Sequence, residues 1–430
     1  MTDNEGRESR VSLTRPASAP PSDEAAHVQE QWQHHCRCDW SHQGPTSAMT
    51  RVSDLRYPPP KGLLLIPLAI FIALVAAEAL LRAFPRLLPV DLQIALEDSP
   101  ETRGVSHPYI GYLPTPNFPL IVRTSEFNIP YPTDAHGFNN AEPWPTRADI
   151  VTIGDSLTFG YGVAPDQAWP ALLARDQRAA KVINLGLIGA GPQQYLRVYE
   201  TFGVPLEPKI LLIGFFVGND FWDAEKFDAW LSSGVGGNYM AWRDFGRHTG
   251  AVEEVLGNSY VYHWARYVRE IYRNWRADEP KDLRLADGRH LKLRPRAMAE
   301  NTASVEPGNR IFELVVDALE RINAIATSHG TDVLVVLLPS KEETYLPLLD
   351  GTPADPGAPL RAALAADGIA YLDLLPAFRA HAEAGAKLFF EYDGHPNAEG
   401  YRLVAKEVLA HLEGNAAAYG LAAARRWVRR

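Results

Sequence analysis

The chain has 430 residues, of which 46% are hydrophobic and 22% are charged. This composition is typical of a globular protein and excludes a fibrous or wholly disordered one, while the length leaves room for tails or a membrane segment beside a folded domain. The formal net charge of -10 excludes a basic surface for nucleic acid, so we expect no nucleic-acid partner.

Residues 1–61 are expected to form a disordered polar tail, because they are of low complexity and end in YPPPKG. The tail holds the only two cysteines, Cys36 and Cys38, so the rest of the chain cannot contain a disulfide. Their motif, HHCRC, has metal-binding residue types but no second ligand cluster nearby, so we expect no metal site. Met49 would be a more natural start before an anchor, which leaves open whether residues 1–48 are translated.

Residues 62–84 are predicted to be a transmembrane anchor or a signal segment. The run LLLIPLAIFIALVAAEALLRAF stays apolar up to Ala77, and Glu78 lies near the far end, where its side chain can reach the interface. The AEA sequence at 77–79 resembles a signal cleavage site, but the run is longer than the roughly 7–15 apolar residues of a signal peptide. We favour a single-pass anchor in the inner cell membrane, with the bulk of the chain extracytoplasmic, on the periplasmic side.

The remaining chain is predicted to hold an extended, proline- and aromatic-rich lead-in over 85–147, with short edge strands and turns, and an α/β domain over 148–412. Apolar runs predict strands at 149–155, 181–186, 209–216, 331–339 and 369–375. Amphipathic stretches predict helices at 167–177, 311–330 and 358–368. Such alternation indicates a parallel sheet covered on both faces. An irregular insert is expected at about 222–309 and a basic C-terminal tail at 413–430.

Three predicted strands end in residues that suit acyl transfer. The first ends in Gly154-Asp155-Ser156, the second in the glycines of NLGLIGAG, and the third in Gly218-Asn219-Asp220. Because parallel strands deliver their carboxyl ends to one edge, these ends combine a nucleophilic hydroxyl, close backbone N–H groups and a carboxamide donor. Taken alone, Asp155 or Ser156 is more often a helix cap. A dinucleotide-binding loop is disfavoured, since GLIGAG lacks the G-x-G-x-x-G spacing.

A serine nucleophile needs a base and a group that orients the base. Asp393 and His395 stand two residues apart in FFEYDGHPNAEG, before a predicted amphipathic helix. In an extended loop such residues point to the same side, so the carboxylate can reach the imidazole. A lone histidine here would more often be a polar loop residue, but beside the strand-end residues the catalytic interpretation is favoured.

At these residues the chain resembles the SGNH, or GDSL, hydrolases. The blocks that carry the resemblance are GDSL at 154–157, Gly189 within NLGLIGAG, GND at 218–220 and DGHPN at 393–397, in the family's order and within residues 145–412. The resemblance implies a flavodoxin-like three-layer α/β/α sandwich, Ser156 as nucleophile and His395 as base. It also implies an oxyanion hole formed by the Ser156 and Gly189 N–H groups and the Asn219 side chain.

One spacing departs from the family pattern. Many members have D-x-x-H in the last block, whereas this chain has D-x-H, with Asp393 two residues before His395. The shorter spacing is similar to that of membrane-associated polysaccharide O-acetyltransferases related to the alginate acetylation proteins. Lys341, in LLPSKEETY, follows a strand end, but we expect a surface or helix-start residue rather than a substrate contact.

Aromatic residues crowd into the insert and could wall the crevice, although the small core of an insert is the interpretation we favour. They are Trp222, Trp230, Tyr239, Trp242, Phe245, Trp264, Tyr267, Tyr272 and Trp275.

The leading hypothesis is a serine esterase that forms an acyl-serine on an acylated glycan or lipid outside the cytoplasm, with no cofactor. The alternative is a membrane-tethered O-acyltransferase acting on an extracytoplasmic polysaccharide. A non-catalytic glycan-binding protein is the second alternative, and it is disfavoured because all four chemical blocks are present. The oligomeric state and the acyl chain length stay open.

Overall fold

The computed structural model describes residues 61–89, 92–93, 104–176, 180–245, 259–277, 279–351 and 354–421. By its contacts the chain divides into two units, Met1–Ile66 and Pro67–Arg430. The polar tail up to residue 60, with its HHCRC motif and Met49, lies outside the described residues, and so does most of the basic C-terminal tail.

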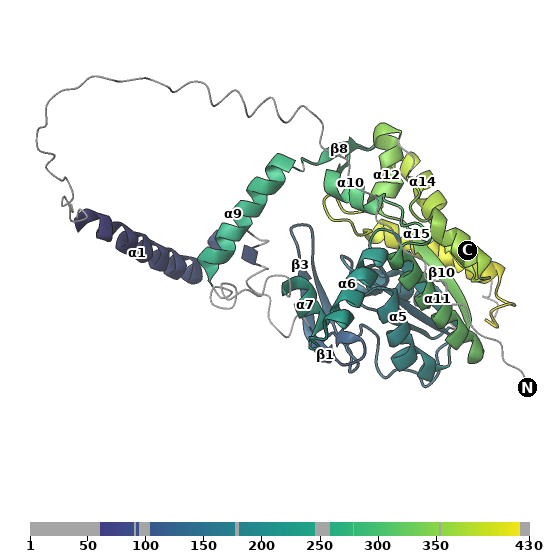
Figure 1. The fold of residues 1–430 in the computed structure, drawn as a ribbon. Helices are drawn as coiled ribbons and strands as arrows, with labels where there is room; N and C mark the ends of the chain where they lie inside the picture. The colour runs from purple at the N-terminus through teal and green to yellow at the C-terminus, as the bar shows by residue number, and fades with distance from the viewer. Residues whose placement is uncertain are drawn as a thin grey trace, which may run out of the picture. The chain divides into compact units, whose positions relative to one another are not determined.

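A five-stranded parallel sheet forms the centre of the second unit (Figure 1). Its strands are β5 (Ile150–Gly154), β6 (Val182–Gly186), β7 (Ile210–Phe216), β10 (Asp332–Leu338) and β11 (Tyr371–Asp373). Across the sheet they run β11-β10-β7-β5-β6, which is the flavodoxin-like order. The expected fold class and all five expected strands are therefore confirmed, with somewhat shorter bounds.

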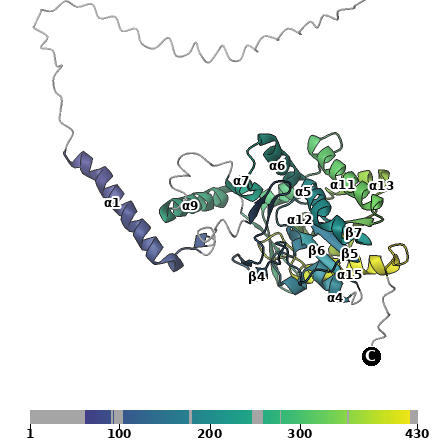
Figure 2. The ribbon, with the colours of Figure 1, turned by 90° about the horizontal axis from the view of Figure 1, so that it is seen from below.

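Helices cover both faces of this sheet (Figure 2). One face packs on α5 (Pro192–Val198), α6 (Asp220–Ser233), α11 (Arg310–Ser328) and α13 (Ala358–Ala366). The other packs on α4 (Trp169–Asp176), α12 (Lys341–Asp350), α14 (Leu375–Glu383) and α15 (Ala398–Gly414). Successive side chains of a strand point to opposite faces, so Val335 joins the first core and Val336 the second.

The lead-in contains short strands, as expected, and they form two separate antiparallel hairpins that do not join the main sheet. The pairs are β1 (Val105–His107) with β2 (Gly111–Leu113), and β3 (Pro119–Arg123) with β4 (Asn128–Pro132). Pro119, Pro130 and Pro132 have no backbone N–H to donate, which suits a small hairpin with solvent at its edges better than an extended sheet.

The insert is mainly helical rather than irregular. After α6 it holds α7 (Tyr239–Phe245), α9 (Tyr260–Ala277), β8 (Lys281–Arg284), β9 (His290–Leu293) and α10 (Pro295–Asn301). Trp230 and Tyr239 are buried in the core, as expected for an insert packed on the domain. Trp264 and Tyr272 of α9 are 45% and 55% exposed, so for them that expectation was wrong.

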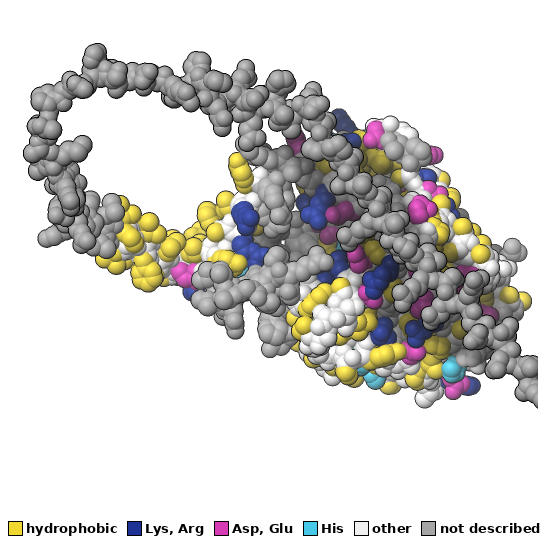
Figure 3. Space-filling view, in the orientation of Figure 1, with side chains coloured by type: hydrophobic (Ala, Val, Ile, Leu, Met, Phe, Trp, Pro, Cys, Tyr) yellow, Lys and Arg dark blue, Asp and Glu magenta, His cyan; other side chains and the backbone are white. Residues whose placement is uncertain are grey.

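Helix α1 (Lys61–Ala83) contains the expected apolar segment. Its residues Leu65–Ala83 have a mean hydropathy of 2.2, which makes the helix long and apolar enough to cross a membrane, and a signal sequence would satisfy the same test. Its exposed apolar side chains are visible in Figure 3. Glu78 accepts hydrogen bonds from the Ser259 hydroxyl and from the N–H groups of Tyr260 and Val261, so it caps α9.

Short helical turns lie between these elements. They are the 3-10 turns Pro85–Leu87, Pro165–Gln167 and Val204–Leu206, and the π turn Tyr199–Gly203.

Candidate active site

Ser156 lies at a sharp turn between β5 and the single-turn helix α3 (Ser156–Phe159). The turn is tight at Gly154, where a Cβ would lie 2.1 Å from the Thr158 Oγ1 and 2.6 Å from the Gly214 carbonyl oxygen. Asp155 caps the helix, because its Oδ1 accepts the Leu157 N–H at 2.8 Å. The capping interpretation therefore holds for Asp155, and it leaves the Ser156 hydroxyl for other partners.

The loop between α14 and α15 brings the histidine to this serine. His395 Nε2 lies 2.8 Å from Ser156 Oγ, and His395 Nδ1 lies 2.6 Å from Asp393 Oδ1. The same Asp393 oxygen accepts the His395 backbone N–H at 2.8 Å, so the D-x-H spacing lets one carboxylate oxygen bind both the backbone and the ring of the histidine. Burial alone would raise the pKa of Asp393, but the hydrogen bonds and charge of His395 hold that pKa below its ordinary value.

Gly189 and Asn219 line the same cavity as Ser156 and His395, and its volume is about 600 Å³. Gly189 has φ +70°, a left-handed conformation that favours glycine, and its carbonyl accepts a hydrogen bond of 2.9 Å from Arg243. Asn219 stands at the N-cap position of α6, yet its side chain makes no capping hydrogen bond. Its Oδ1 is buried and lacks a partner among the described residues, so the carboxamide is not committed to holding the helix.

Two buried carboxyl groups lie behind these residues. Asp220 accepts the Tyr195 hydroxyl at 2.7 Å and the Phe216 N–H at 3.0 Å, just after Gly218 in the turn that follows β7. Burial raises the pKa of Asp220 well above its ordinary value and that of Asp155 to about 7. Asp155 Oδ2 also accepts the Ser156 hydroxyl at 3.4 Å, and the other contacts of the two carboxyl groups, to the backbone and to Tyr195, hold the two strand ends in place.

Polar and charged side chains form one wall of the cavity. Asp223, Lys226, Arg243 and Asn301 line the cavity, together with Tyr161 and Gly394. Lys226 pairs with Asp223 at 3.1 Å, and Arg243 lies 3.7 Å from the same carboxylate.

Lys341 differs from the expectation of a surface residue. It is the first residue of α12, as one interpretation held, but only 1% of it is exposed. Its ammonium donates to the backbone carbonyls of residues 390–393, which lead into the Asp393–His395 turn. Burial lowers the pKa of Lys341.

Three residues near the site escaped the sequence-based reasoning: Glu126, Tyr161 and Arg243. The Tyr161 ring packs on the His395 ring with centroids 4.4 Å apart, and Glu126 contacts the backbone of the same loop. None of the three lies in a motif, so the sequence offered no signal for them. Among the described residues no group of three or more histidine, cysteine or acidic side chains is placed to hold a metal ion.

Comparison with solved structures finds chains of similar type at low identity. They include a member of the lipolytic protein G-D-S-L family from Veillonella parvula DSM 2008 (16% identity, 61% of this chain and 96% of that chain, TM-score 0.33). Others are a catalytic mutant of an acetylxylan esterase from Geobacillus stearothermophilus (13%, 66% and 97%, TM-score 0.35) and a psychrotrophic esterase from Pseudoalteromonas sp. (12%, 62% and 97%, TM-score 0.30). At these scores the likeness carries no argument about substrate.

No curated protein matches the chain. The model of the GDSL-like Lipase/Acylhydrolase family matches residues 152–403, which is more than half of the chain and includes all four blocks of the resemblance. The chain therefore belongs to the GDSL-like lipase/acylhydrolase family and is a carboxylic ester hydrolase of that family.

Proposed function

We propose that Ser156 is the nucleophile of an esterase, with His395 as its base and Asp393 as the group that orients the imidazole. The observation that carries this proposal is the 2.8 Å contact between Ser156 Oγ and His395 Nε2, continued by the 2.6 Å contact between His395 Nδ1 and Asp393. Such a chain of contacts is the arrangement by which a serine is activated.

In the first half of the reaction, Ser156 Oγ attacks the ester carbonyl carbon and its proton passes to His395 Nε2. The tetrahedral intermediate collapses as the bond to the alcohol oxygen breaks, and His395 returns the proton to the departing alkoxide. The products of this half are a free alcohol and an acyl-serine. Asp393 keeps the Nδ1 proton in place and stabilises the imidazolium while it exists.

In the second half, a water molecule attacks the acyl-serine and gives a proton to His395. The bond between the acyl carbon and Ser156 Oγ then breaks, the acid leaves, and the serine recovers its proton from His395. In both halves the developing oxyanion would be met by the N–H groups of Ser156 and Gly189 and by the Asn219 carboxamide. Their common position on one cavity supports this assignment.

For the substrate we propose an acyl ester of a glycan or a lipid, met outside the cytoplasm. The polar wall around Asp223, Lys226 and Arg243 supports a polar alcohol part and a short acyl group. The apolar helix Leu65–Ala83 supports a membrane anchor.

Acyl transfer to an extracytoplasmic polysaccharide is the second candidate. It uses the same acyl-serine, with a sugar hydroxyl in place of water. Two observations support this second candidate: the D-x-H spacing at Asp393 and His395, and the candidate anchor.

One experiment separates the candidates: turnover of p-nitrophenyl acetate by the full chain, with and without an oligosaccharide acceptor. Release of acetate that does not depend on acceptor indicates a hydrolase, and acceptor-dependent acetylation of the sugar indicates a transferase. A folded protein that neither turns over the ester nor reacts with a fluorophosphonate would contradict the proposed nucleophile.

A further inference from the structure

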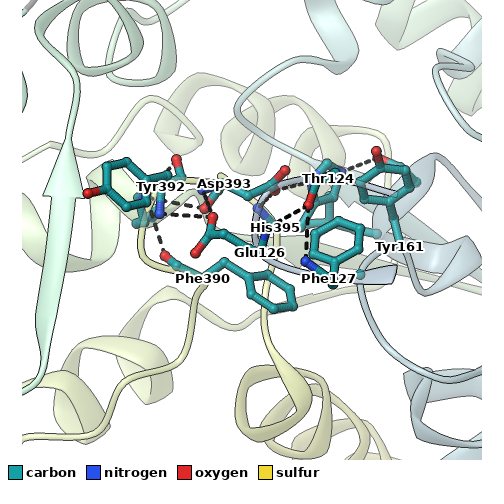
Figure 4. Close-up of polar contacts among 12 residues, drawn as sticks. Thr124, Glu126, Phe127, Tyr161, Phe390, Tyr392, Asp393 and His395 are labelled. Carbon is teal, nitrogen blue, oxygen red and sulfur yellow. Dashed lines mark hydrogen bonds and ion pairs between the residues drawn. The ribbon is translucent and has the colours of Figure 1, made fainter. Parts of the chain in front are cut away.

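The loop that carries Asp393 and His395 is held through its backbone by a carboxylate from the lead-in (Figure 4). Glu126 Oε1 accepts the N–H of Glu391 at 2.8 Å. Glu126 Oε2 accepts the N–H groups of Tyr392 and Asp393 at 3.0 and 2.6 Å. Hydrogen bonds to an ionised acceptor are about twice as strong as neutral ones, so three of them restrain this segment firmly.

On the carbonyl side of the same segment stands the ammonium of Lys341. It lies 3.4, 3.1, 3.3 and 3.1 Å from the carbonyl oxygens of the four residues 390–393. The carbonyl of one residue and the N–H of the next belong to a single peptide unit. Three successive peptide units therefore have their N–H on Glu126 and their C=O on Lys341, and their dipoles run from one charge to the other.

This arrangement compensates the charge of a buried cation. An ammonium that is almost fully buried would be costly without partners, and here the carbonyl oxygens supply them, with the carboxylates of Glu342, Glu126 and Asp393 nearby. Glu126 and Lys341 thus bind opposite ends of the same three peptide units. If Glu126 or Lys341 were removed, the segment would keep hydrogen bonds only on its carbonyl side or only on its N–H side.

The tip of the β3–β4 hairpin fixes Glu126 in turn. Thr124 Oγ1 accepts the N–H groups of Glu126 and Phe127 at 3.1 and 3.2 Å. The Phe127 ring packs against Phe390 and, edge on, against Tyr161, with centroids 5.0 and 5.4 Å away. Tyr161 is the ring that packs on His395 (Figure 4). The hairpin thus contacts the candidate base both through the backbone of its loop and through an aromatic stack.

We propose that Glu126 is a positioning residue for ester cleavage: with Lys341 it holds the peptide units before Asp393, and so sets the place of His395 against Ser156. This inference rests on the proposed roles of Ser156 and His395. If so, the β3–β4 hairpin of the lead-in contributes to catalysis and does not merely connect the candidate membrane segment to the domain.

The test uses the full chain and the variants Glu126→Ala and Glu126→Gln, with Glu142→Gln as the matched control. Glu142 lies in the same lead-in and accepts one backbone N–H, that of Ala135 at 2.9 Å. The measurements are kcat and KM on p-nitrophenyl acetate, the fraction of protein labelled by a fluorophosphonate, and the labelling rate of that fraction. A displacement of about 1 Å in a catalytic group costs on the order of 10²-fold, so we expect Glu126→Ala to lower kcat per labelled site by roughly 10–100-fold with little change in KM.

Glu126→Gln should fall between Glu126→Ala and the unsubstituted chain, because its one amide oxygen can still accept the Tyr392 and Asp393 N–H groups. The control Glu142→Gln should keep full activity. A variant that loses only the labelled fraction, with an unchanged rate per labelled site, would overturn the inference, and so would unchanged kcat in Glu126→Ala. If the unsubstituted chain is itself folded but inert to ester and probe, the proposed function fails instead.

Discussion

The guanidinium of Arg243 holds the Gly189 peptide from the insert, donating a 2.9 Å hydrogen bond to the Gly189 carbonyl oxygen. A Cβ at Gly189 would lie 2.0 Å from the arginine Nη1, so the guanidinium would have to move, and the φ of +70° at this position independently favours glycine. The insert therefore reaches into the wall of the candidate oxyanion hole.

This contact predicts the behaviour of Arg243→Met. The variant keeps an apolar stem but loses the hydrogen bond to the Gly189–Ala190 peptide unit. Residue 189 is then less firmly held, and with it the N–H of the adjoining Ile188–Gly189 unit, so kcat should fall by roughly tenfold, the equivalent of one charged hydrogen bond at about 1.5 kcal/mol. Lys226→Met is the control, because Lys226 lines the same cavity without contacting Gly189 through any hydrogen bond of the described structure. Equal losses of kcat in both variants would point to cavity charge, not to alignment of the peptide.

Removal of the hydroxyl should have the largest effect of any single change. Ser156→Ala is expected to lower turnover by on the order of 10⁴-fold or more and to abolish fluorophosphonate labelling, because no acyl-serine can form. Ser328→Ala, at an exposed serine near the end of α11, serves as the control and should label normally. Persistent labelling of Ser156→Ala would place the nucleophile elsewhere.

Two asparagines at the starts of helices are expected to affect different quantities, Asn219 the turnover and Asn309 the stability. Asn309 caps α11, since its side chain accepts the Ile311 N–H at 2.9 Å, whereas Asn219 makes no such bond to α6. Asn219→Ala should therefore lower kcat by about 10²–10³-fold with nearly unchanged thermal stability. Asn309→Ala should lose about 1 kcal/mol of stability with unchanged kcat. Calorimetry and steady-state kinetics on both variants check the contrast. If Asn219 were purely structural, Asn219→Ala would lose stability and keep its kcat.

Glu343 predicts a pH dependence of stability. Burial raises its pKa to about 8 even though its carboxylate accepts the Ser340 N–H at 2.8 Å. Its folded pKa then lies above the ordinary 4.5, so the contribution of its protonated form is complete below pH 4.5 and is lost as the pH rises through about 8. Glu343→Gln should thus lose less stability between pH 5 and pH 8 than the unsubstituted chain, as the unfolding temperatures at the two pH values would show. An identical pH slope in the variant would contradict this assignment.

The fold was largely predictable because its signals are local. Each central strand is a short Val/Ile/Leu run bounded by turn residues, as in β7 and β10, and both of its faces are buried. The juxtaposition of Ser156 and His395 was also predictable, because the acid and histidine of DGHPN supply the base that a strand-end serine needs, and the four blocks stand in the order of the family they resemble. The insert was harder, because the helical pattern of α9 does not reveal that Trp264 and Tyr272 stay exposed.

By itself the sequence determined the layer order, the strand ends and the serine, histidine and aspartate that meet there, because these follow from side-chain type and spacing. Only the tertiary structure decided how the histidine loop is held. Glu126 accepts the Asp393 N–H across 267 positions, and Lys341 binds the carbonyls of the same segment. Both charges bind main-chain groups, and since almost every residue carries the same N–H and C=O, no pattern of side chains records such a contact.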